Sequence, residues 1–65
     1  MNLPRLKGII RERDTNYVQC ANAIGRSVAA FSSKMNGHST FDVEEFEDLA
    51  NFLQMSDSEK CEVYF

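Results

Sequence analysis

The chain has 65 residues, which suffices for one small domain with a thin margin of stability. Hydrophobic residues make up 43% of it, which excludes an intrinsically disordered chain, and its two cysteines and single histidine cannot complete a zinc site. The net charge of −3 is by itself a weak argument against nucleic-acid binding, and no apolar stretch approaches the roughly 20 residues that cross a membrane.

The first predicted helix covers residues 4–13. Pro4 suits its first position, because the N–H that proline lacks would have no partner there. Apolar residues then recur at spacings of three and four and form one stripe, namely Leu3, Leu6, Ile9 and Ile10. The polar run 14–16 breaks this pattern and ends the helix.

Two short helices are predicted next, over residues 17–24 and 28–35. Asn16 and Ser27 are favourable N-caps for them, and Gln19 stands where it could complete a capping box with Asn16. The first helix carries apolar residues at helical spacing, namely Tyr17, Cys20, Ala21 and Ile24. Gly25 can supply the positive φ that ends this helix. Helices joined by so tight a turn cannot lie antiparallel, so we expect a helix-turn-helix arrangement.

The second helix of this pair is expected to have two faces. Phe31 and Met35 would reach back into the core, while the small residues on the other side would point outward. The pair Asn36-Gly37 ends the helix, and a loop follows.

The last two predicted helices cover residues 43–53 and 57–65, with Asp42 and Ser56 as their N-caps. The apolar face of the fourth helix comprises Val43, Phe46, Leu49, Ala50 and Leu53. In the fifth helix, Cys61, Val63 and Phe65 are available for packing. Cys20 and Cys61 both occupy apolar positions, so we interpret them as reduced core residues, which fits a cytoplasmic protein.

Residues 16–37 read NYVQCANAIGRSVAAFSSKMNG and resemble the helix-turn-helix of Cro and lambda-repressor-type regulators. The matching positions are the small Ala21, Gly25 in the turn, Ser27, the apolar Phe31 and the exit Asn36-Gly37. The flanking segments resemble the first and closing helices of short versions found in phages of Gram-positive bacteria. The resemblance implies an all-α fold, a compact five-helix bundle with one lambda-repressor-like DNA-binding domain over residues 1–65 and the motif at 16–36.

The resemblance also implies that the helix at 27–36 enters the major groove of operator DNA. Its base-reading residues would be Val28, Ala29, Ser32 and Ser33. Two hydroxyl groups and two small apolar side chains distinguish bases poorly, because the specific contacts come mostly from Arg, Lys, Asn and Gln. We therefore expect modest sequence specificity.

Candidates for contacts with DNA phosphates lie along the motif and just beyond it: Asn16, Tyr17, Arg26, Ser27, Lys34, Asn36 and His38, with Arg11 as a further basic residue. Asn16 could equally be only a cap, and Tyr17 only a core residue. Arg26 is the preferred candidate, since the family usually has an apolar residue there and a charge in a tight turn needs a reason.

The distribution of charge along the sequence supports a DNA-facing role for the first half of the chain. Residues 1–34 hold six basic and two acidic side chains, a net charge of +4, whereas residues 35–65 hold one basic and eight acidic ones, a net charge of −7. This asymmetry predicts a polar molecule with one face for an anion and another turned away from it. The acidic fourth helix is interpreted as a solvated face, with binding of a basic partner as the alternative.

These features together predict a sequence-specific transcriptional regulator of phage or mobile-element type, such as a repressor, in the cytoplasm of a bacterial host. Its partner is double-stranded operator DNA, bound as a homodimer for which Val63, Tyr64 and Phe65 of the last helix are the candidate surface. The alternative is a protein-binding modulator or antirepressor with a helix-turn-helix fold, which acts on a partner repressor and binds DNA weakly or not at all. No enzyme, cofactor or metal is expected, because the sequence has no Gly-rich phosphate loop, metal cluster or nucleophile paired with a base.

Overall fold

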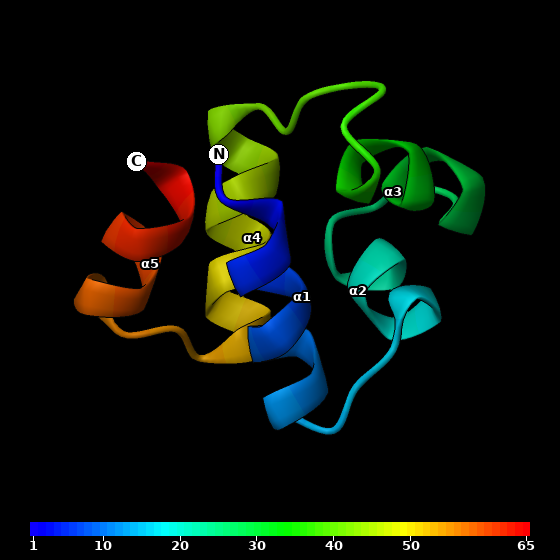
Figure 1. The fold of residues 1–65 in the computed structure, drawn as a ribbon. Coiled ribbons are helices and arrows are strands. Elements are labelled where there is room, and N and C mark those ends of the chain that lie inside the picture. The colour runs from blue at the N-terminus through cyan, green and yellow to red at the C-terminus, as the bar shows by residue number, and fades with distance from the viewer.

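Five α-helices and no strands make up the computed structural model, which describes all 65 residues (Figure 1). The helices are α1 (Leu3–Glu12), α2 (Tyr17–Ala23), α3 (Val28–Met35), α4 (Val43–Leu53) and α5 (Asp57–Tyr64). Each corresponds to one of the five predicted helices. None of them combines the length and the apolar character that a membrane-spanning helix requires.

Side-chain caps define where the helices begin. The caps of α2 to α5 are the predicted ones, namely Asn16, Ser27, Asp42 and Ser56, and Asn2 caps α1 in the same way. The boxes of α4 and α5 are complete, since Glu45 and Glu59 each accept a hydrogen bond from the backbone N–H of the capping residue. The box expected at α2 is incomplete, because Gln19 accepts a hydrogen bond from the Thr15 hydroxyl instead.

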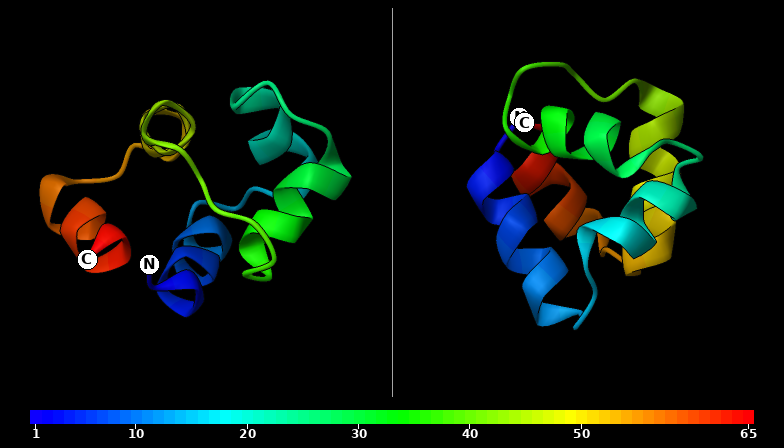
Figure 2. Two further views of the ribbon diagram at one scale, coloured as in Figure 1. Left: turned by 90° about the horizontal axis from the view of Figure 1, so that it is seen from above. Right: turned by 90° about the vertical axis from the view of Figure 1, so that its right-hand side faces the viewer.

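Two helices lie in the centre of the molecule, and the other three lie on either side of them; we call these two sides the flanks. α1 and α4 lie in the middle, α5 packs on one side and the α2–α3 pair on the other, as the view from above shows (Figure 2). The two chain ends meet at one end of the molecule, where the backbone N–H of Asn2 donates to the carbonyl oxygen of Val63 at 2.6 Å.

Phe31 is the largest fully buried side chain of the core. Its ring meets Tyr17 and Phe41 edge-on, with centroid distances of 5.2 and 5.7 Å. The largest fully buried side chains come from every helix: Phe31, Leu6, Ile9, Met35, Leu49, Leu53, Val63 and Cys20. The predicted inward orientation of Phe31 and Met35 is confirmed.

The assignments for α5 need correction. Val63 is its only buried residue, whereas Cys61 is exposed and Phe65 is 91% exposed. Cys61 is therefore not the core residue that the apolar pattern predicted. The apolar residues of α5 do not all lie on the side that faces its neighbours. The side chains that α5 directs towards α1 include the charged Glu59 and Glu62.

Candidate nucleic-acid interface

The connection between α2 and α3 comprises only residues 24–27. Gly25 adopts a φ of +69°, and a Cβ atom built there would meet nothing within 4 Å. Glycine is therefore favoured by the backbone conformation and not by lack of space. The Arg26 backbone N–H donates to the Ala21 carbonyl oxygen at 3.0 Å, and Ala21 is buried. This small side chain allows close packing where the chain turns back on itself.

α3 presents an uncharged surface outward. Val28 is 43% exposed and Ala29 is exposed, whereas Ser32 and Ser33 are half-buried. The Ser33 hydroxyl accepts from the Ser39 hydroxyl at 3.4 Å, so it is partly engaged within the chain. The four predicted base-reading residues thus form a surface of small side chains, of which only the two in the first turn of α3, Val28 and Ala29, are exposed.

Asn16 caps α2 and Tyr17 packs against the core, which are the structural roles that the sequence offered as alternatives to phosphate contacts. The Asn16 side-chain oxygen accepts from the Gln19 backbone N–H at 2.9 Å, and the half-buried Tyr17 packs against Phe31. The Asn16 side-chain NH₂ group makes no hydrogen bond within the chain, so it remains available to an external acceptor.

Ser27, Asn36 and His38 mark the two ends of α3. The Ser27 hydroxyl accepts from the Ala30 backbone N–H at 3.1 Å, as an N-cap does. Asn36 and His38 are exposed at the opposite end, where the His38 backbone N–H donates to the Ser33 carbonyl oxygen. The helix dipole is negative at that end, which makes it a poorer place for a phosphate than the start of α2.

The positive charge of Arg26 in the turn is explained by its ion pair with the buried carboxylate of Glu45. Arg26 Nε donates to Glu45 Oε2 at 2.6 Å, and Lys34 Nζ lies 3.1 Å from Glu45 Oε1. Glu45 is only 5% exposed. The Asp42 backbone N–H, with Lys34 and Arg26, lowers the pKa of Glu45 below its ordinary value. Glu45 therefore joins the turn, α3 and the start of α4.

This arrangement weakens the case for two predicted phosphate contacts. The Lys34 side chain is 13% exposed and also donates to the Thr40 carbonyl oxygen at 2.9 Å, so its charge is used inside the chain. Arg26 is half exposed, but it lines a polar cleft of about 160 Å³ together with several carboxylates, namely Asp42, Glu44, Glu45 and Asp48. Carboxylates so close disfavour an anion at Arg26.

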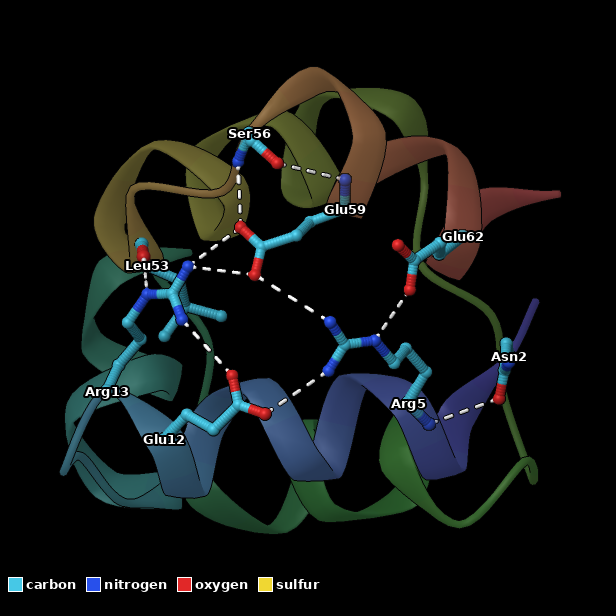
Figure 3. Close-up of polar contacts among 8 residues, drawn as sticks. All are labelled: Asn2, Arg5, Glu12, Arg13, Leu53, Ser56, Glu59 and Glu62. Carbon is cyan, nitrogen blue, oxygen red and sulfur yellow. Dashed lines mark hydrogen bonds and ion pairs between the residues drawn. The ribbon is translucent and has the colours of Figure 1, made fainter.

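The predicted separation of a basic face from an acidic one does not hold in space. Four of the six basic residues of the first half pair with carboxylates of the second half: Arg5 with Glu62, Arg13 with Glu59, and both Arg26 and Lys34 with Glu45. Figure 3 shows the α1–α5 part of this pairing, in which Arg13 Nη2 lies 2.7 Å from Glu59 Oε1. Chain folding thus neutralises most of the positive charge.

Two basic residues have no carboxylate partner, Lys7 and Arg11 of α1. Both are exposed. They line a cleft of about 280 Å³ at the start of α2 together with Ile10, Thr15, Asn16 and Tyr17. Lys7 was not singled out from the sequence, although its i, i+4 spacing to Arg11 on the polar side of α1 was visible there. The remaining positive charge therefore lies beside Asn16 and Tyr17.

Comparison of the chain with family models, with curated proteins and with solved structures finds no match in any of the three. No group of three or more His, Cys, Asp or Glu side chains could hold a metal ion. The function must therefore be inferred from the residues of this chain.

Proposed function

We propose that the chain is a sequence-specific DNA-binding transcriptional regulator of the Cro and lambda-repressor type, of phage or mobile-element origin. In this proposal α2 and α3 are a helix-turn-helix, and α3 enters the major groove of operator DNA. The observation that carries it is the two-sided α3, in which Phe31 and Met35 are fully buried while Val28 and Ala29 lie outward directly after the Gly25 turn.

The cleft at the start of α2 is the proposed phosphate site. Lys7 and Arg11 supply the unpaired positive charge, and the Asn16 side-chain amide supplies a hydrogen-bond donor. Each phosphate neutralised lowers the logarithm of affinity by about 0.9 per tenfold increase in salt. Two such contacts for each copy give weak binding. A homodimer on two half-sites about one helical turn apart would raise the affinity.

A titration of the full chain against labelled DNA from upstream of its own gene tests this proposal, with fluorescence anisotropy measured at several salt concentrations. Replacing Lys7 and Arg11 together by Ala should reduce the salt slope by about 2 per bound copy. Lys60→Ala is the matched control, because Lys60 lies on α5 and should leave the slope unchanged. Absence of binding at low salt would contradict the proposal.

The second candidate is a protein-binding modulator or antirepressor that acts on a partner repressor. The pairing of Arg26 and Lys34 with Glu45 favours it, because it leaves the α3 surface without a free charged side chain. In this case the titration would show no DNA binding, and a repressor encoded beside this chain would form a complex with it in a gel-filtration assay.

A further inference from the structure

The hydroxyl groups of α3 and its cap all have hydrogen-bond partners within the chain. Ser27 accepts from the backbone at the start of the helix, and Ser33 pairs with Ser39 of the following loop. The Ser32 hydroxyl accepts from the side-chain NH₂ group of Asn36 at 3.5 Å. Ser32 and Ser33 are also half-buried. A base edge that approached these hydroxyl groups would therefore compete with hydrogen bonds that are already made.

The charged side chains around α3 are directed away from its first turn. Arg26 and Lys34 both pair with Glu45, and α3 itself contains no acidic residue that would repel DNA. Its first turn also lacks Arg, Lys, Asn and Gln, the side chains that make paired hydrogen bonds to purines. The outward side of this turn is therefore uncharged and has no side chain that suits a purine edge.

The first turn of α3 instead exposes methyl groups. Val28 is 43% exposed and Ala29 is exposed, and both side chains end in methyl groups alone. In the major groove most groups on the base edges are hydrogen-bond donors or acceptors, and thymine alone adds a methyl group, at C5. An apolar side chain can gain from burial only against that methyl group. The chemistry of this turn therefore matches one base.

We propose that α3 recognises operator DNA chiefly through the 5-methyl groups of thymines, which contact Val28 and Ala29 in the major groove. This inference rests on the proposed function, because it requires α3 to enter that groove. Burial of one methyl group contributes about fourfold to affinity. Each operator half-site therefore has at least one T·A pair beneath the start of α3, and the modest specificity expected from small side chains follows from the size of this contribution.

Modified bases test the chemistry of the contact. The DNA fragment from upstream of the gene is prepared with thymine or with uracil, which lacks the 5-methyl group but keeps the same hydrogen-bonding edge. Fluorescence anisotropy of the full chain should show binding to the uracil fragment weakened by about fourfold for each contacted thymine. Single replacements then locate these positions. There, 5-methylcytosine should bind about fourfold more tightly than cytosine, because it restores only the methyl group.

Matched variants test whether α3 makes the contact. At one of the located positions, Val28→Ser should bring the ratio of the affinities for thymine and uracil close to 1, because it removes the methyl groups of the protein. Val43→Ser is the control and should keep the ratio of the unmodified chain. Val43 is also an exposed valine at the first residue of a helix, in this case α4. Both positions are exposed, so the fold should persist, which circular dichroism checks.

The possible outcomes separate this inference from the proposed function. Binding that uracil leaves unchanged would overturn the inference and leave the proposed function standing. Absence of binding to both fragments would overturn the two together. Equal ratios for Val28→Ser and Val43→Ser would contradict the contact by α3. A larger change of base preference in Ser32→Ala than in Val28→Ser would assign the readout to a hydroxyl group and overturn the inference as well.

Discussion

The two flanks of the molecule are attached to the central helices by different forces. The α2–α3 pair buries Cys20, Ala21, Phe31 and Met35, so apolar packing holds it. α5 buries only Val63 and is held to α1 by the network of arginines and glutamates in Figure 3. The Arg5–Glu62 pair is exposed and the Arg13–Glu59 pair is only part-buried, and ion pairs open to solvent each contribute little and weaken in salt. The comparison indicates that α5 opens more readily than the side that carries the proposed interface.

The largest expected effect comes from the packed flank. Phe31→Ala should lower the free energy of unfolding by about 3–5 kcal/mol, since it removes a fully buried ring that two other rings contact. A domain of this size has only about 3–5 kcal/mol to lose, so the variant should be largely unfolded. Circular dichroism during urea titration measures this. Val18→Ala should leave the midpoint unchanged, and a folded Phe31→Ala variant would contradict the core assignment.

A smaller effect is expected at the buried carboxylate, the one place where charge supports the packed flank. Glu45→Ala leaves Arg26 and Lys34 without their acid and removes a hydrogen bond to the Asp42 backbone N–H. We expect a loss of about 2 kcal/mol, because Arg26 is half exposed and can be solvated. Glu44→Ala, at an exposed neighbour without an ion pair, is the control for urea unfolding. If the two substitutions lowered the free energy of unfolding equally, Glu45 would contribute no more to stability than an ordinary surface residue.

The smallest effect concerns pH, and it should separate the flanks. The pKa of Glu59 is lowered by the Ser56 backbone N–H and by Arg13. Stability from such a carboxylate is present above its ordinary value of 4.5 and is lost as the pH falls through the lower folded value. The protection factors of the α5 amide protons, which are corrected for the slower intrinsic exchange in acid, should therefore fall below about pH 4.5, while those around Phe31 stay high.

Glu45 also has a lowered pKa, so acid weakens the start of α4 too, but Phe31 and Met35 still hold α3. Glu59→Gln should remove most of the pH dependence of the α5 protection factors. Loss of protection in both flanks at the same pH would show that the molecule opens as one unit, against the comparison drawn above.

The five helices could be predicted because capping residues and the spacing of apolar residues are local features of the sequence. Asn16, Ser27, Asp42 and Ser56 cap the helices that they were expected to cap, and helical spacing placed Phe31 and Met35 in the core. The two faces of α3 follow from the same spacing. These predictions need only residues within one or two helical turns of each other.

The electrostatics of the candidate site could not be predicted in this way. Arg5 and Glu62 are 57 positions apart, and Arg13 and Glu59 are 46 apart, so no local pattern pairs them. Glu45 stands among other acidic residues and looked like part of a solvated face, yet it is buried against Arg26 and Lys34. A sum of charges along the sequence therefore overstated the basic character of the first half.

The bond between Asn2 and Val63 has a practical consequence. Because it holds the two ends of the chain together, a short linker from residue 65 to residue 1 could join them without crossing α3. New ends could then be opened in the exposed loop at residues 36–40. Such a rearranged chain would keep all five helices, with its new ends between α3 and α4.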